Sequence, residues 1–439
     1  MSQPSHLSPG RLLAPLTASA LLLSACATPT PTPAAAPATP AAPVASTPSI
    51  EVGGNAREVS GQTTRLLYAH ADGLTLVDAG TGEVVDETHR PGFLRLNNAG
   101  NGRHVLVTEG DRFLVYDAGV QSRPHGDHAH HYTYNPGLTG LEYPADKAGH
   151  ATPHAGRTTL FADGTGEISI IETAHIADPT ATVTRTRTDH AHHGVALTLS
   201  DDSLLTTQGT AESRSTVQVR KGEAVLAQTD DCPGVHGEAS AKPTEAGDVV
   251  LLGCTNGPVV WRDGAFHKVS APDAYARTGN AAGSPASPVV LTDYKSDKDA
   301  KQERPSRVAL VDTRANTLQL VDLGSSYWFR SLARGAHGEA LVLTYDGAVK
   351  VLDPDSGAVT ASIPAIEPWQ EKENWQDAGP SIKVAGHHAY VTDAETKTVA
   401  VVDLQEMRVV NTLRLAHTPV ELAVVNGLPE GEDDGHGHP

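Results

Sequence analysis

The sequence predicts an all-β protein, a β-propeller of eight four-stranded blades that is closed by its C-terminal strand. Three observations support this prediction: a strand–turn pattern that repeats, the lack of a sustained helical period, and a last segment that completes the first repeat. About eight repeats of roughly 45 residues fit between residues 65 and 425, and this is the length of a four-stranded blade. A period of 3.6 residues is nowhere maintained.

Each repeat has a β-branched strand, a turn rich in glycine and aspartate, and a second strand that often ends in Val-Asp. The segment RLLYAHADGLTLVDAGTGEVV from Arg65 and the segment EALVLTYDGAVKVLDPDSGAV from Glu339 show this most plainly. Further copies begin at Arg103, Arg157 and His388, and weaker ones near Ser203, Asp248 and Ser287. Seven blades is the alternative if one weak copy is an insertion.

Closure of the ring follows from the two ends of the repeat region. The first repeat starts at its second strand and lacks an inner one, whereas the segment HTPVELAVV from His417 shows strand alternation after the last repeat. This segment can supply the missing inner strand, and no sheet edge is then left open.

The N-terminal residues predict a lipoprotein signal peptide over residues 1–25. Arg11 precedes an apolar run too short to span a bilayer, and the run ends in Leu23-Ser24-Ala25-Cys26, the pattern of bacterial lipoprotein processing. Cys26 would then carry the acyl chains that hold the protein at a membrane. The alternative is an ordinary secretory signal, and both place the mature chain outside the cytoplasm.

Composition divides the rest of the chain. Residues 26–49 are mostly Ala, Pro and Thr and predict an extended tether of up to roughly 70 Å. Residues 50–427 form the predicted propeller, and residues 428–439 an acidic, disordered tail with His436 and His438. The net charge of −19 argues against nucleic acid or anionic lipid as a partner and attracts cations. We expect a monomer that touches the membrane only through its lipid anchor.

Histidines are concentrated in one part of the chain, with ten of the 22 between His125 and His193. The first cluster, HGDHAHH, is predicted to be a mobile loop after the third strand of the second blade. Several imidazoles at such spacing favour a zinc, copper or nickel site, and the alternative is a solvated polar loop. The candidate metal ligands here are His125, Asp127, His128, His130 and His131.

Further histidines occur where successive inner strands begin. His150 precedes the third blade, His190, His192 and His193 the fourth, and His236 with Glu238 the fifth. Because inner strands line the central channel of a propeller, we expect His150, His193 and His236 to meet on one face and bind one ion. His154, His337 and His387 fall on the opposite face and are expected to be structural. The tail histidines either capture metal weakly or have no role.

After Cys26 the chain contains only Cys232 and Cys254. An isolated pair in an oxidising compartment predicts a disulfide. A thiolate metal site is the alternative, because His236 lies close to Cys232.

These motifs resemble the extracytoplasmic zinc metallochaperones of the AztD type. The resemblance spans the whole propeller and rests on HGDHAHH at His125, on HHGVALTLSDDSLL from His192, and on the block from CPGVHGEA to LLGC between Cys232 and Cys254. It implies a zinc-binding propeller with bridged cysteines that transfers Zn²⁺ to the solute-binding protein of a zinc ABC importer. Of the residues above it implicates His125, His128, His130, His192, His193 and His236. The lipobox, tether and histidine tail lie outside the family pattern.

The sequence contains no motif of a hydrolase or a nucleotide-binding enzyme. HExxH, GxSxG and phosphate-binding glycine loops are absent, and only 4% of the residues are aromatic. We therefore expect a non-enzymatic zinc carrier. The alternatives are a propeller hydrolase or lactonase, in which Glu238 acts as a general base beside His236, and a protein-binding propeller with incidental metal binding. Imidazole ligands alone do not distinguish zinc from copper or nickel.

Overall fold

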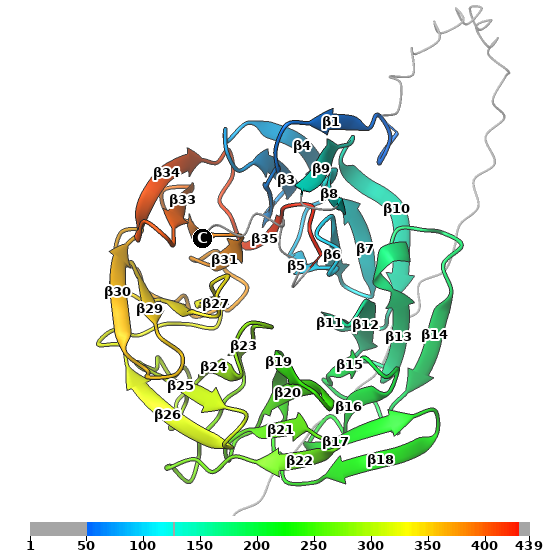
Figure 1. Ribbon diagram of the computed structural model, residues 1–439, viewed down its shortest axis with the longest axis vertical. Helices are drawn as coiled ribbons and strands as arrows, with labels where there is room; N and C mark the ends of the chain where they lie inside the picture. Colours follow the sequence, from blue (N-terminus) through cyan, green and yellow to red (C-terminus); the bar gives the residue numbers. More distant parts are fainter. Residues whose placement is uncertain (1–50, 126–127, 430–439) are drawn as a thin grey trace, which may run out of the picture. The chain divides into compact units, whose positions relative to one another are not determined.

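A computed structural model describes residues 51–125 and 128–429. The predicted signal peptide, the whole predicted tether with Cys26, Asp127, and residues 430–439 of the tail with His436 and His438 lie outside the described residues. Within them the protein is built from antiparallel sheets, eight of four strands and one of three. Figure 1 shows the four-stranded sheets following one another around a central axis, which confirms the predicted propeller.

Four of the sheets contain the N-terminal half of the chain and the last strand. From the inner to the outer strand they are β35 (Glu421–Val425), β2 (Arg65–His70), β3 (Gly73–Asp78) and β4 (Val84–His89); β5 (Arg95–Asn98), β6 (His104–Glu109), β7 (Arg112–Asp117) and β10 (Gly137–Pro144); β11 (Ala148–His154), β12 (Arg157–Ala162), β13 (Glu167–Glu172) and β14 (Val183–Arg187); and β15 (Ala196–Thr198), β16 (Leu204–Gly209), β17 (Arg214–Lys221) and β18 (Ala224–Thr229).

The other four sheets follow in chain order. They are β19 (His236–Thr244), β20 (Gly247–Gly253), β21 (Val259–Arg262) and β22 (Ala265–Lys268); β23 (Ala281–Ala282), β24 (Val289–Asp293), β25 (Arg307–Asp312) and β26 (Thr317–Asp322); β27 (Leu332–Arg334), β28 (Ala340–Leu343), β29 (Ala348–Leu352) and β30 (Val359–Pro364); and β31 (Ile382–Ala385), β32 (His388–Asp393), β33 (Thr398–Asp403) and β34 (Arg408–Arg414).

The core lies between neighbouring sheets. Middle strands such as β2 are buried along their whole length, whereas outer strands such as β4 and β34 are mostly exposed. One apolar cluster joins Leu67 and Leu76 of one sheet to Leu96 and Val105 of the next. The sheets therefore hold one another by face-to-face packing, and this leaves the inner strands free to line the centre.

The ring closes as the sequence predicts. β35 pairs with β2 from Arg65 opposite Val425 to Ala69 opposite Glu421 and supplies the missing inner strand. The carboxylate of Glu421 also accepts hydrogen bonds from Nε and Nη2 of Arg330, at 2.9 and 2.6 Å, and both side chains are largely buried. This contact joins Arg330, which precedes β27, to the first residue of the closing strand β35.

The first histidine cluster is not a loop, as the sequence analysis expected, but a β-hairpin. β8 (Val120–His125) and β9 (His128–Thr133) pair with each other, and β1 (Arg57–Val59) adds to β9 as a third strand. The hairpin is inserted between the third and fourth strands of its sheet, β7 and β10. Backbone pairing between β8 and β9, extended by β1, gives this polar insertion its regular structure.

The described residues contain a single helix, the 3₁₀ turn η1 (Thr173–His175). None of their helices has the length and apolar character needed to cross a membrane.

Candidate metal centre

Three histidines from three consecutive sheets converge at the centre of the propeller. His150 lies in β11, His193 three residues before β15, and His236 at the start of β19, strands that Figure 1 shows next to one another around the centre. Their ring centroids are 5.1 to 5.4 Å apart, and one nitrogen of each ring lies within 4.8 Å of the others. We refer to His150, His193 and His236 as the central triad. The structure thus brings together the three residues that the repeat spacing predicts to meet.

The backbone around the central triad is irregular, and this directs the rings inward. The pairing register of β11 shifts between Ala148 and Ala151, and that of β19 shifts between His236 and Glu238. Such bulges change the direction of a side chain at a strand end. The three rings line a cavity of about 1100 Å³ and are only partly buried, so a ligand can reach them from solvent.

Each ring of the central triad has its Nδ1 atom held by an acceptor. His193 Nδ1 lies 2.6 Å from Asp163 Oδ2, His150 Nδ1 lies 3.2 Å from Glu238 Oε1, and His236 Nδ1 lies 2.6 Å from the carbonyl oxygen of Gly279. A carbonyl oxygen can only accept, so the Nδ1 of His236 carries the proton and its Nε2 keeps a lone pair. Metal-binding histidines are oriented in the same way.

Two glycines make room for these acceptors. A Cβ on Gly237, whose φ is +78°, would lie 2.4 Å from the Gly279 carbonyl oxygen that holds His236. A Cβ on Gly149 would lie 2.3 Å from Oδ1 of Asp163, the carboxylate that holds His193. This Oδ1 atom is buried and has no hydrogen-bond partner among the residues that the structure describes, so the carboxylate is held chiefly through its contact with the imidazole.

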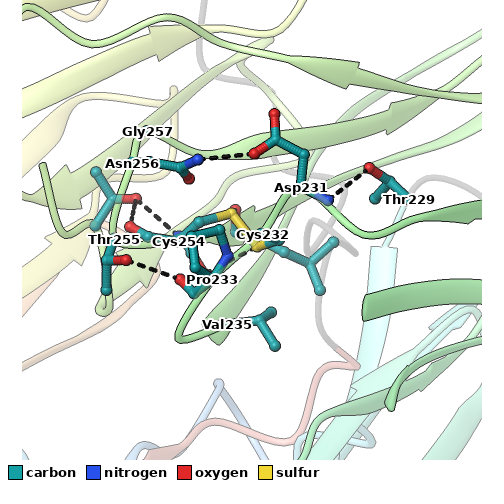
Figure 2. Close-up of a disulfide and its surroundings, with 12 residues drawn as sticks. Thr229, Asp231, Cys232, Pro233, Val235, Cys254, Thr255, Asn256 and Gly257 are labelled. Atoms are coloured by element: carbon teal, nitrogen blue, oxygen red, sulfur yellow. Dashed lines mark hydrogen bonds between the residues drawn. A yellow bond between two sulfur atoms is a disulfide. The ribbon is translucent and has the colours of Figure 1, made fainter. Parts of the chain in front are cut away.

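A disulfide fixes the turn that leads into His236. Figure 2 shows Cys232 bonded to Cys254, as the sequence predicts, with Val235 at the end of the same turn. Thr255 N and Oγ1 both donate to the carbonyl oxygen of Pro233, at 2.8 and 3.1 Å. The turn before β19 is therefore tied to the end of β20, just ahead of His236, by the disulfide and by these two hydrogen bonds.

Burial and neighbouring charges set the protonation of the central triad. Burial, reinforced by His150, lowers the pKa of His236 to about 3, so this ring is neutral throughout the physiological range. Burial also opposes charge on His150, but the carboxylate of Glu238 outweighs it and raises the pKa of that ring. The ring of His236 is thus available to a metal throughout this range, whereas His150 has to lose its proton before it can bind one, and this becomes harder as the pH falls.

Glu238, a predicted ligand, is placed behind the central triad rather than within it. Its carboxylate contacts His150 and also accepts a hydrogen bond from Thr152 Oγ1 at 3.0 Å. Burial opposes ionisation of this carboxyl, yet His150 and Thr152 outweigh that cost and lower its pKa. The residue therefore orients an imidazole and stays ionised.

The hairpin brings a second set of three histidines together. His125 is directly opposite His128 across the hairpin, and His130 is two residues further along β9. Opposed residues, and residues two apart on one strand, lie on the same face of a sheet, so the three rings cluster with centroids 5.1 to 5.7 Å apart. Glu58 of β1 contacts Nδ1 of His130 at 2.6 Å. We refer to His125, His128 and His130 as the hairpin cluster.

The hairpin cluster does not adjoin the central triad. β7 begins at the Gly110–Asp111 turn, which lines the cavity of the central triad, and the hairpin follows the other end of β7. At its base, Ser122 N donates to Gly427 O, and Gly427 N donates to Gly102 O in the turn between β5 and β6. The hairpin therefore leaves its sheet at the end opposite the central triad.

Three further predicted ligands are not brought into either group. His131 lies on the other face of the hairpin, buried, with Nδ1 2.9 Å from Ser122 Oγ. His190 is exposed. His192 is buried, and its two ring nitrogens contact His190 O at 3.0 Å and Thr207 Oγ1 at 2.9 Å. In the segment before β15, His192 thus packs into the core while the neighbouring His193 lines the cavity.

Histidines expected to be structural have structural contacts. His154 lies between Asp248 Oδ1, 3.0 Å from its Nε2, and Ser240 Oγ, 3.1 Å from its Nδ1. His337 and His387 pack against each other with ring centroids 5.4 Å apart.

Two features of the structure were not predicted from the sequence. Asp163 occupies the turn between β12 and β13, and nothing in the local sequence links it to His193. A third group of possible ligand residues, His70, Asp72 and His417, joins the two ends of the repeat region. One indication of this group was present in the sequence, because the segment predicted to close the ring begins at His417.

Comparison with known proteins supports the resemblance found in the sequence. No family model matches the chain. The zinc chaperone AztD of Citrobacter koseri is 23% identical over 378 residues, which cover 83% of this chain and 86% of that protein. A structure of apo AztD from the same organism has a TM-score of 0.70 at 21% identity and covers 84% of this chain and all of the matched chain. A second crystal structure of C. koseri AztD gives 0.72 at 22% identity, again over the whole matched chain and 85% of this one. The resemblance to AztD is confirmed, and the structural likeness shows the fold.

Proposed function

We propose that this protein is a zinc metallochaperone that captures Zn²⁺ outside the cytoplasm and transfers it to the solute-binding protein of a zinc ABC importer. The observation that carries the proposal is the central triad, three imidazoles from three sheets with each Nδ1 already held by an acceptor. Resemblance to a protein named as a zinc chaperone supports zinc over copper or nickel, which imidazole ligands would also suit.

The central triad has the composition of a site that can release its metal. A tetrahedral zinc ion holds nitrogen ligands at about 2.0–2.1 Å, and three histidines leave its fourth position open. Such ligand atoms lie about 3.3 Å apart, so the rings have to close by no more than about 1.5 Å from their present positions. The cavity that the three rings line would admit a ligand of an acceptor protein to this position before the three histidines release the ion.

The hairpin cluster is proposed as a separate zinc site. Its histidines are more exposed than those of the central triad, and it lies at the other end of the sheets, so it supplies no fourth ligand there. We expect weaker binding at the hairpin, because exposed side chains lose more freedom on binding.

A hydrolytic role is less well supported. A general base that works near neutral pH needs a pKa close to 7, whereas the pKa of Glu238 is lowered by His150 and Thr152 despite its burial. Its carboxylate is also engaged with both residues. We therefore assign Glu238 to the orientation of His150.

Attachment to a membrane through Cys26 belongs to the same proposal and rests on the sequence alone. Lipidation would keep the carrier near an importer in the same membrane. If this is correct, Cys26→Ala moves the protein from the membrane fraction to the soluble fraction. Unchanged partitioning of the variant would contradict lipid anchoring.

The experiment compares three variants of the mature chain with the wild type. They are His193→Gln with His236→Gln in the central triad, His125→Gln with His128→Gln in the hairpin cluster, and His154→Gln as a control histidine that contacts Asp248. Zinc affinity is measured by competition with a chromogenic chelator, and transfer by mixing loaded protein with an apo zinc-binding protein.

Loss of a residue that supports a metal ligand typically lowers metal affinity roughly 10–100-fold. The central-triad variant lacks two of the proposed ligands themselves, so we expect its zinc affinity to decrease by more than this. The hairpin variant should keep tight binding at the remaining site, and the control should match the wild type. Tight binding that survives in the central-triad variant and disappears in the hairpin variant would overturn the proposal for the central triad.

A further inference from the structure

The joint between the first and last strands of the propeller carries a group of metal-binding side chains. His70 is the last residue of β2, Asp72 lies in the turn between β2 and β3, and His417 lies four residues before β35. One ligand atom of each lies within 4.8 Å of the others. The two imidazole rings are stacked, with centroids 4.0 Å apart and planes inclined by 7°. We refer to His70, Asp72 and His417 as the closure cluster.

The closure cluster has one buried member and two that solvent can reach. His70 is 7% exposed, Asp72 is exposed, and the side chain of His417 is 37% exposed. Within residues 51–125 and 128–429 the Asp72 carboxylate accepts no hydrogen bond, and Glu87 Oε1 lies 3.5 Å from Nε2 of His417. Two imidazoles with nearby carboxylates are a donor set that zinc and similar divalent ions prefer.

The ring of His70 can offer a lone pair at small cost. Its Nε2 is 3.1 Å from Thr75 Oγ1, and its Nδ1 accepts a hydrogen bond from the Asp72 amide that is long, at 3.3 Å. A metal ion on Nδ1 would replace this weak bond.

We propose that the closure cluster binds a divalent ion of the zinc class and fastens the last strand of the propeller to the first. The ligands come from β2, from the turn after it and from the segment before β35, so they meet only when β35 is paired with β2. An ion that binds only this closed state stabilises it in proportion to its occupancy. The site is separate from the central triad and does not depend on the proposed transfer function.

The test uses the full mature chain, with zinc as the only ligand. His417→Gln removes one ligand, and Asp72→Asn removes another at an exposed position where the fold is not at risk. His387→Gln is the matched control, because His387 also packs against a second histidine, His337, with ring centroids 5.4 Å apart. Zinc per chain is counted by equilibrium dialysis, and hydrogen exchange of the β35 amides reports opening of the joint.

We expect the two closure variants to bind one ion fewer than the wild type and the control. In the wild type, zinc at about 100 times the dissociation constant of the site should raise the protection of the β35 amides about 100-fold. This rise should vanish in both closure variants and persist in a variant that lacks His193 and His236. An unchanged ion count, or the same zinc-dependent protection in His417→Gln as in the wild type, would overturn the proposal. The stacked rings would then be a packing contact.

Discussion

Replacing Asp163 tests whether the acceptors behind the central triad set zinc affinity. The Oδ2 atom of Asp163 lies 2.6 Å from Nδ1 of His193, and only 21% of the aspartate side chain is exposed. The variant Asp163→Asn keeps the shape and an acceptor oxygen but loses the negative charge, whereas Asp163→Ala loses the contact entirely. We expect both variants to fold and to bind zinc more weakly.

The expected loss of zinc affinity follows from the hydrogen bond between Asp163 and His193 that each variant weakens or removes. A hydrogen bond to a charged group contributes about 1.5–3 kcal/mol and a neutral one about 1 kcal/mol. The asparagine variant should therefore lose about 1–2 kcal/mol of binding free energy, which is roughly 5–30-fold in the dissociation constant. The alanine variant also leaves the Nδ1–H without an acceptor and should fall near the upper end of the roughly 10–100-fold typical of such residues.

Competition with a chromogenic chelator at fixed pH measures the two dissociation constants. Asp248→Asn is the matched control, since Asp248 is also partly buried and contacts His154 at 3.0 Å but lies outside the central triad. Equal losses in Asp163→Asn and Asp248→Asn, or an affinity for zinc within twofold of the wild type in Asp163→Ala, would refute the argument.

Three further predictions concern the same region. Gly237→Ala should weaken zinc binding and lower the free energy of unfolding by about 1–3 kcal/mol more than the control Gly264→Ala. Both glycines have φ near +77°, but only a Cβ at Gly237 would lie 2.4 Å from a carbonyl oxygen. Equal unfolding midpoints of the two variants would contradict this prediction. As the pH is lowered, zinc affinity should begin to decrease while the pH is still above about 6.5, because Glu238 raises the pKa of His150 and a proton competes with zinc for that ring. The variant Glu238→Gln should shift this decrease to lower pH. A zinc affinity that is independent of pH between about 5 and 8 would exclude this prediction. Reducing the disulfide, which closes a loop of 22 residues, should cost about 3 kcal/mol in urea unfolding, and identical midpoints with and without reductant would count against that role.

Repetition made the fold and the central triad predictable. The eight copies of one strand–turn pattern place His150, His193 and His236 at equivalent positions of consecutive sheets, so their convergence follows from the symmetry of a ring. The closure of β2 by β35 follows in the same way, because the first copy lacks a strand that the last segment supplies.

Features that break the repeat were not predictable. The hairpin is extended to a three-stranded sheet by β1, which precedes it by some 60 residues and carries no sign of that pairing. His192 and His193 are indistinguishable in sequence, and only the direction of the chain before β15 decides which ring faces the cavity. Asp163 and the closure cluster depend on contacts between segments far apart in the chain, and a single sequence gives no measure of such distances.

Pairing of Arg65 with Val425 also dictates when the protein can finish folding during its synthesis. Until residues 421–425 have been made, the earliest sheet has three strands, and the hydrogen-bonding edge of β2 stays open. An open edge of apolar strand is a template for a second nascent chain. A product truncated before Glu421 should therefore associate with other copies through this edge, even though seven of its four-stranded sheets are complete.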